Sequence, residues 1–234
     1  MISYSKQVID SKEIRAVSKV LKSEYLTQGP LVKKFEEKIS NYCNSKYAIA
    51  VNSATSGLHI ACMTLGVKKN DIVWTSAISF VASANAAVYC GADIDFLDIS
   101  LEDYNIDIKS LEKKLIVAKR KNKLPKVIIV VHFAGNPCQM KEIYLLKKKY
   151  KFKIIEDASH ALGARYINKR VGNCEFSDMC VFSFHPVKSI TTAEGGIVTT
   201  NNKKFFNDLK LYREHGINRN FINKKVRPKY YEQI

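Results

Sequence analysis

Short apolar runs alternate with longer segments of helical periodicity over most of the chain. The apolar runs predict strands, and they are found at 47–51, 72–74, 94–97, 127–131 and 152–156. The segments between them predict helices, which are expected near 54–65, 79–89, 110–117 and 140–150. Strands that alternate with helices are typical of βαβ units, in which neighbouring strands run parallel. The pattern therefore predicts an α/β fold, with a sheet flanked by helices.

The rhythm of the chain changes after Asp157. Three further apolar runs, 164–167, 179–184 and 196–200, follow one another with little helix between them, and a last helix is expected near 203–215. Strands joined without a crossover helix can pair antiparallel. We therefore expect one mixed, mostly parallel sheet.

Two helices are expected before the first strand. Asp10 and Glu13 have capping-box spacing, which predicts a helix start. An apolar stripe at helical spacing follows, formed by Ile14, Val17, Val20 and Leu21. Gly29 then breaks the pattern, and Pro30 suits the first turn of a second helix. We expect residues 1–45 to form N-terminal helices that pack on a large domain, 46–234.

The charge of the chain is unusually positive, with 38 basic and 22 acidic residues and a net charge of +16. The segment 109–153 holds fourteen basic residues against two acidic ones, which accounts for +12 of that total. Only seven of the basic residues are arginines, although arginine is the residue best suited to bidentate recognition of phosphates. A solvated lysine-rich face is therefore favoured over a nucleic-acid site, and no nucleic-acid partner is expected.

Membrane, metal and disulfide chemistry are not expected either. The longest uninterrupted aliphatic run, 127–131, is far too short to span a bilayer. The six cysteines form no CxxC pair and none lies near a histidine at metal-ligand spacing, so buried free thiols are predicted. No secretory leader is visible at the N-terminus, and we expect a cytoplasmic protein.

A first candidate site is the Asn52-Ser53-Ala54-Thr55-Ser56-Gly57 stretch, which follows a predicted strand and opens a predicted helix. Free backbone N–H groups and hydroxyl donors make such a helix start suitable for binding an anion such as phosphate. The alternative is simple N-capping by a serine or threonine side chain.

A second candidate site is the stretch 156–163, which follows a predicted buried strand and contains Asp157 and His160. In α/β proteins, ligands bind at the carboxyl ends of the parallel strands. A carboxylate at this edge could hold a cation or a protonated ring nitrogen, or it could simply cap the next turn.

The third candidate site is 182–196, where Ser183 ends a predicted strand and Lys188 lies in the following loop. A desolvated lysine beside a phosphate-binding hydroxyl is what Schiff-base chemistry requires. The alternative is an ordinary lysine, since the chain contains 31 of them. A serine hydrolase is disfavoured because the chain has no G-x-S-x-G motif.

The three stretches, in this order and separation, resemble the DegT/DnrJ/EryC1/StrS family of pyridoxal-phosphate (PLP)-dependent aminotransferases. The resemblance runs from about Ser3 to the last residue, and it is strongest at 26–30, 156–163 and 183–196. It implies the large domain of a fold-type I PLP-dependent transferase, as in aspartate aminotransferase. It also implies amination of a UDP-linked 4-keto-6-deoxy sugar, with L-glutamate as the amino donor.

The resemblance assigns roles to individual residues. Lys188 matches the lysine that forms the Schiff base and moves the proton, and Asp157 matches the carboxylate that faces the pyridine nitrogen. The positions that match the phosphate-binding residues are Ser53, Ala54, Thr55 and Ser183. Phe80 matches the aromatic residue stacked on the ring, and His160 matches a position near the ring hydroxyl. The positions that match the sugar-nucleotide pocket are Tyr4, Glu24, Tyr25, Leu26 and Thr27. His185 and Glu194 lie in the motif without an assigned role.

The family continues beyond the last residue of this chain, into a stretch similar to Gly-Tyr-Asn-Tyr-Arg and a further small domain. The resemblance therefore implies a large domain that is incomplete at its C-terminal end, with the small domain missing. It also implies a homodimer with shared active sites. Two alternatives stay open: a catalytically incompetent fragment of such an enzyme, and a PLP-dependent sugar dehydratase of the same fold, in which histidine replaces the Schiff-base lysine.

Overall fold

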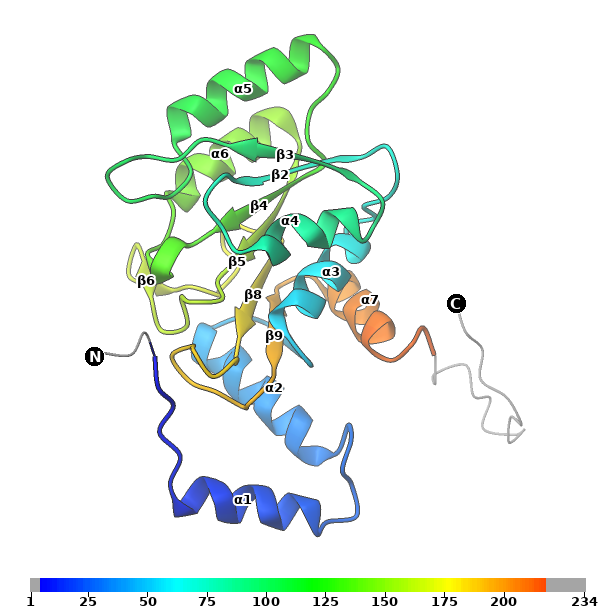
Figure 1. Ribbon diagram of the computed structural model, residues 1–234. Coiled ribbons are helices and arrows are strands. Elements are labelled where there is room, and N and C mark those ends of the chain that lie inside the picture. The colour runs from blue at the N-terminus through cyan, green and yellow to red at the C-terminus, as the bar shows by residue number, and fades with distance from the viewer. Residues whose placement is uncertain (1–4, 218–234) are drawn as a thin grey trace, which may run out of the picture.

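Seven strands form one central sheet in the computed structural model, which describes residues 5–217 (Figure 1). Their spatial order is β1 (Tyr47–Val51), β9 (Gly196–Thr200), β8 (Met179–Ser183), β5 (Lys153–Asp157), β4 (Val127–Val131), β2 (Ile72–Ser76) and β3 (Asp93–Leu97). Strand β9 runs antiparallel to its neighbours β1 and β8, and every other neighbouring pair is parallel. The predicted α/β fold with a mixed, mostly parallel sheet is confirmed.

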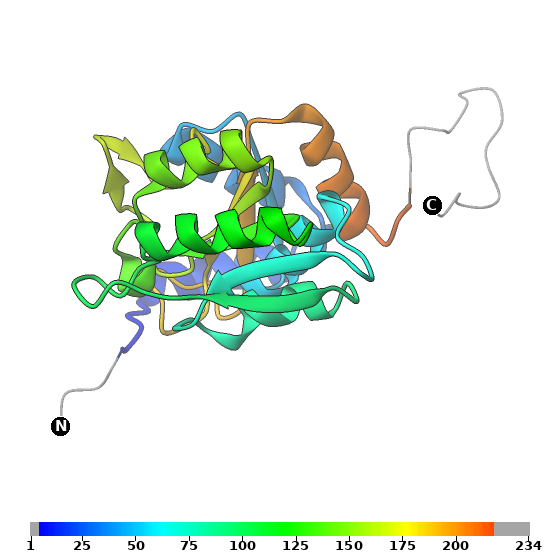
Figure 2. The same cartoon turned by 90° about the horizontal axis from the view of Figure 1, so that it is seen from above.

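Helices cover both faces of this sheet, as Figure 2 shows from above. One face packs against α3 (Ala54–Thr64), α4 (Val81–Val88) and α7 (Lys203–Arg213). The other face packs against α5 (Ile108–Arg120) and α6 (Met140–Tyr150), and next to them against α2 (Pro30–Cys43). Alternate side chains of each strand enter opposite cores, because strand side chains alternate between faces. Ile154 and Ile155 of β5, for example, are both fully buried, in different clusters.

The helix α3 lies unusually close to the sheet at Gly57. A Cβ atom at this position would lie 2.9 Å from Cγ1 of Val181 on β8 and 3.2 Å from Cγ2 of Val198 on β9. A glycine lets helix and sheet backbones approach closely. This contact holds the N-terminal end of α3 at the edge of the sheet where strand β1 ends.

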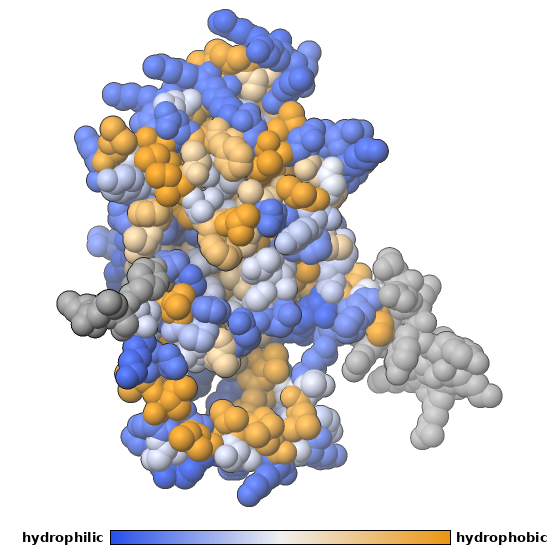
Figure 3. All heavy atoms as spheres, viewed as in Figure 1, coloured by the Kyte–Doolittle hydropathy of each residue, from blue (hydrophilic) through white to orange (hydrophobic). Residues whose placement is uncertain are grey.

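The two N-terminal helices differ in their burial. Helix α1 (Ser11–Leu21) has the predicted capping box, in which the Asp10 N–H donates to Oε2 of Glu13 at 2.9 Å, but none of its residues is buried. Three residues of its apolar stripe, Ile14, Val17 and Leu21, are exposed, and Figure 3 shows apolar side chains gathered along this helix at the bottom of the view. Helix α2 packs against β1 and buries Ile39. The division of the chain at residue 45 stays a prediction.

The predicted strand 164–167 does not join the central sheet. It contributes β6 (Arg165–Tyr166), which pairs antiparallel with β7 (Lys169–Arg170) in a separate hairpin. The two residues between these strands, Ile167 and Asn168, both have positive φ values, of 46° and 62°. Two successive residues of positive φ form the tight turn that closes a two-residue hairpin loop. The chain therefore folds back on itself before it can reach the sheet.

The six cysteines are free thiols, and all but Cys90 are buried. Within residues 5–217, no group of three or more His, Cys, Asp or Glu residues could hold a metal ion. No helix in the described part of the chain is long and apolar enough to cross a membrane.

Candidate active site

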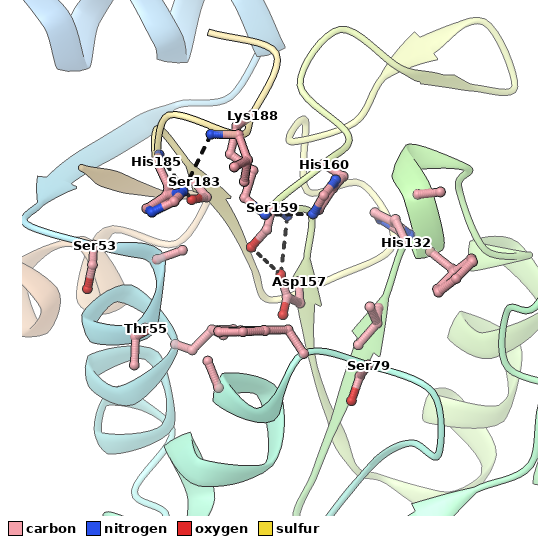
Figure 4. A pocket seen from close by; sticks show the side chains of 18 of the residues that line it. Ser53, Thr55, Ser79, His132, Asp157, Ser159, His160, Ser183, His185 and Lys188 are labelled. Carbon is pink, nitrogen blue, oxygen red and sulfur yellow. Dashed lines mark hydrogen bonds between the residues drawn. The ribbon is translucent and has the colours of Figure 1, made fainter. Parts of the chain in front are cut away.

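The three candidate stretches meet in one cavity of about 690 Å³ at the carboxyl ends of β4, β5 and β8 (Figure 4). Its lining includes eight residues that the sequence singled out for the cofactor: Ser53, Ala54, Thr55, Phe80, Asp157, His160, Ser183 and Lys188. Figure 4 shows Lys188 and His160 above Asp157, with Ser53 and Thr55 to one side. The fold thus brings together residues from four separate parts of the chain.

Lys188 lies in the loop between β8 and β9, where its backbone N–H donates to the carbonyl of His185 at 2.9 Å. Its Nζ atom lies 2.6 Å from Nε2 of His160. Burial lowers the pKa of Lys188 below the ordinary lysine value, and the negative charge of Asp157 partly opposes this effect. Burial also lowers the pKa of His160, as does the neighbouring Lys188, while Asp157 opposes both. Burial therefore makes the neutral, nucleophilic form of this amine more accessible than that of an ordinary lysine.

Asp157 ends β5 and is 4% exposed. Its Oδ2 accepts a hydrogen bond from Oγ of Ser83 at 2.6 Å. Its Oδ1 accepts from Oγ of Ser159 at 2.6 Å and from the Ser159 N–H at 3.2 Å. None of the ion pairs found within residues 5–217 includes Asp157. A buried carboxylate held only by neutral donors is suited to a ligand that brings a positive charge.

The anion-binding end of the cavity is the start of α3. Ser53 is the N-cap, and its Oγ accepts a hydrogen bond from the Ser56 N–H at 3.1 Å, so the simpler capping role is present. Ala54 and Thr55 occupy the first helical turn, whose N–H groups have no intrahelical acceptors. Ser183, at the end of β8, lines the same cavity. The site therefore offers both backbone and hydroxyl donors to an anion.

Gly196 holds the start of β9 directly against this helix start. A Cβ atom there would lie 2.5 Å from the carbonyl carbon of Ser53 and 2.6 Å from the backbone N of Ala54. No real Cβ atom approaches backbone atoms so closely, and these neighbours cannot rotate away as a side-chain end would. The donor groups of α3 are thus positioned by the absence of a side chain on the neighbouring strand.

Gly196→Ala is therefore expected to displace the start of α3. We expect the free energy of unfolding to fall by about 1–3 kcal/mol, the usual cost of inserting a methyl group into a packed site. Chemical denaturation measures this loss, and a phosphate-binding assay should show weaker binding. An unchanged denaturation midpoint would show that the backbone of α3 can shift without a loss of stability, which would contradict this prediction.

The remaining predicted residues are placed as follows. Phe80 is the N-cap of α4 and is 73% exposed at the side of the cavity. The stretch 24–27 lies between α1 and α2, and none of its four residues lines the cavity. Tyr4 lies outside the described residues. His185 and Glu194 both line the cavity.

Sequence reasoning missed several residues of this site. His132 is buried beside the cavity, with Nε2 donating to Oε2 of Glu156 at 2.8 Å and Nδ1 accepting from the Cys138 N–H at 3.2 Å. Its place directly after β4, at the edge where Asp157 ends β5, was a signal that could have found it. Ser83 lies inside a helix of small residues and gives no such signal. Ser159 was part of a candidate stretch, but it was not singled out.

The chain matches the DegT/DnrJ/EryC1/StrS aminotransferase family over residues 7–230. A UDP-4-amino-4,6-dideoxy-N-acetyl-beta-L-altrosamine transaminase from Campylobacter jejuni (strain 81-176) is 49% identical over 218 residues, which cover 93% of this chain and 56% of that protein. The protein of the same name from strain NCTC 11168 is 47% identical, with the same coverage.

Solved structures agree with these sequence matches. Helicobacter pylori PseC, an aminotransferase involved in the biosynthesis of pseudoaminic acid, superposes with a TM-score of 0.87 at 36% identity, covering 99% of this chain and 59% of that one. Spr1654 from Streptococcus pneumoniae, in its PLP form, gives a TM-score of 0.86 at 28% identity, covering all of this chain and 61% of that one. The chain thus spans little more than half the length of these relatives. On the family match and these identities, the chain belongs to the DegT/DnrJ/EryC1/StrS aminotransferase family.

Proposed function

We propose that this chain is the cofactor-binding part of an enzyme that uses PLP to transfer an amino group from L-glutamate to a UDP-linked 4-keto-6-deoxy sugar, through a Schiff base at Lys188. The observation that carries the proposal is the placement of Nζ of Lys188 and the carboxylate of Asp157 in one cavity. The amine and the carboxylate are the two groups that PLP chemistry requires from the protein.

The residues present fit PLP by their chemistry. Asp157 is a buried carboxylate without a cationic partner in the described part of the chain, so it can hold a protonated ring nitrogen. The start of α3 and Ser183 offer donors for the phosphate, and Phe80 presents an exposed ring for stacking. When bound, PLP supplies an electron sink that stabilises negative charge on the carbon next to the transferred amino group.

The protein's own groups handle the proton. Burial favours the neutral amine of Lys188, which can attack an aldehyde and can accept a proton at Nζ. His160 lies within hydrogen-bond distance of this nitrogen and holds the amine in place at one wall of the cavity. The carboxylate of Asp157 would favour a proton on the ring nitrogen of bound PLP, because an opposite charge nearby favours the protonated form.

The sugar and its donor are the finer part of the proposal. They are supported by the two relatives from Campylobacter jejuni, whose name describes a UDP-linked amino sugar transaminase, and by the link of PseC to pseudoaminic acid. On this basis the enzyme acts in the biosynthesis of surface glycans that contain such acids. We further propose that it works in the cytoplasm as a homodimer with shared active sites, where UDP-sugar and glutamate are its small-molecule partners.

Two measurements on the full chain test this proposal. Borohydride reduction in the presence of PLP should leave a phosphopyridoxyl group on the peptide that contains Lys188. Incubation with L-glutamate and the UDP-linked keto sugar should then give an amino-sugar product, identified by its mass. A chain without the label would support the incompetent fragment. A product that has lost water, rather than gained an amino group, would support the dehydratase.

A further inference from the structure

The carboxylate of Asp157 is anchored from two directions. Ser83 on α4 donates to Oδ2, and Ser159, two residues along the chain, donates to Oδ1. The hydrogen bond of Ser159 is local, but that of Ser83 joins residues 74 positions apart in the chain. Ser83 is fully buried, so bulk water does not compete for this hydrogen bond in the native protein. The long-range bond is therefore the one through which the tertiary structure orients this carboxylate.

The helix that carries Ser83 also carries the exposed aromatic ring of the cavity. Phe80 is the N-cap of α4, and the Ser83 N–H donates to the carbonyl of Phe80 at 3.1 Å. The first turn of α4 thus links the stacking ring to the carboxylate through one backbone bond and one side-chain bond. A displacement of α4 would therefore move the Phe80 ring and the Asp157 carboxylate together.

We infer that Ser83 is a positioning residue, which holds the Asp157 carboxylate in the orientation that suits the ring nitrogen of PLP. This inference rests on the proposed function. A hydrogen bond from a hydroxyl to a charged carboxylate is among the strong ones, and it fixes the direction in which the carboxylate points. Without that donor the carboxylate is free to turn away from the ring nitrogen, and the protonated form of that nitrogen loses part of its stabilisation.

The structure offers a matched control at Ser76. This serine at the end of β2 is also buried, at 1% exposed, and its Oγ has no hydrogen-bond partner within the described residues. Ser76→Ala and Ser83→Ala therefore remove the same atom from equally buried positions. They differ in whether that atom donates to Asp157. Ser83→Thr keeps the hydroxyl and should restore the hydrogen bond.

The experiment measures PLP binding to the full chain and the ¹⁵N resonance of the ring nitrogen in labelled PLP. Ser83→Ala should weaken PLP binding by about tenfold or more, because hydrogen bonds to charged groups are among the strongest in proteins. The ¹⁵N resonance should move toward that of an unprotonated pyridine. Ser76→Ala should change the dissociation constant by less than about twofold, and Ser83→Thr should return it to within about threefold of the original value.

The possible outcomes separate this inference from the proposed function. If the unmodified protein binds PLP on Lys188, but Ser83→Ala matches Ser76→Ala in affinity and resonance, the inference is wrong and the proposed function stands. A loss of stability in Ser83→Ala without a change in the resonance would assign the hydroxyl a merely structural role and would also overturn the inference. If the unmodified protein binds no PLP, the proposed function fails first, and the inference fails with it.

Discussion

Lys188→Ala is expected to lower the rate of amino transfer by about 10³-fold or more, since it removes both the nucleophile and the group that moves the proton. Stability should change little, because Lys188 is only half-buried in a loop and its amine contacts one side chain, His160. Product formation from glutamate and the keto sugar measures the rate, and thermal unfolding measures the stability.

Lys119→Ala is a suitable control for this prediction. Lys119 is an exposed lysine of α5, which packs on the opposite face of the sheet from α4. Its substitution by alanine should leave both the rate of amino transfer and the labelling of Lys188 unchanged. If Lys188→Ala kept most of the activity, another group would have to supply the amine, and the proposed function would be wrong.

The lowered pKa of Lys188 gives this prediction a pH dependence. Only the neutral amine attacks an aldehyde, so labelling of the Lys188 peptide by PLP should rise with pH as the amine loses its proton. Because burial lowers its pKa, the curve should reach its plateau at lower pH than an ordinary lysine of pKa 10.5. A curve that follows the exposed lysines of the same chain would contradict this account.

Asp157→Asn is expected to weaken PLP binding by about 100-fold or more. A protonated ring nitrogen in a buried site would lose its opposite charge, and breaking a buried ion pair costs about 3–5 kcal/mol. The amide also replaces one acceptor oxygen by a donor group, which faces the hydroxyl of Ser83 or Ser159. Titration with PLP, followed by its absorbance, measures the change in affinity.

The stability of the cofactor-free protein should respond far less to this substitution. The asparagine side chain has nearly the same shape and no longer places an unpaired charge in the interior, so we expect a change of less than about 2 kcal/mol. Asp107→Asn, at the N-cap of α5, is the matched control, because asparagine caps helices as well as aspartate does. Equal PLP affinities for Asp157→Asn and Asp107→Asn would show that Asp157 does not contribute to PLP binding.

Many local features of this protein could be predicted from the order of its residues. The capping box at Asp10 and Glu13 lies where the spacing indicates, and strand β1 has the expected bounds, because these features depend on neighbouring residues. Some helix and strand boundaries differ by a few residues from the predicted ones. Helix α5, for example, begins at Ile108 rather than near 110, because Asp107 accepts a hydrogen bond from the Ser110 N–H at 2.6 Å and caps the helix earlier.

The positive charge of the lysine-rich segment 109–153 is partly neutralised by ion pairs. Much of its positive charge lies on α5 and α6, and some of it is paired locally, as between Lys147 and Asp178 at 2.7 Å and between Lys149 and Glu112 at 3.0 Å. Figure 3 shows hydrophilic side chains gathered over α5 at the top of the view. The first part of this segment, Lys109 to Arg120, contributes no residue to the lining of the cavity.

The sequence by itself determined the class of fold, the family and the chemical types at the site, because periodicity and motifs are properties of the chain order. Only the tertiary structure decided which groups meet. Nζ of Lys188 lies beside His160 across 28 residues of chain, and the Asp157 carboxylate is held by Ser83 across 74. These outcomes depend on packing between distant segments, which no local pattern encodes.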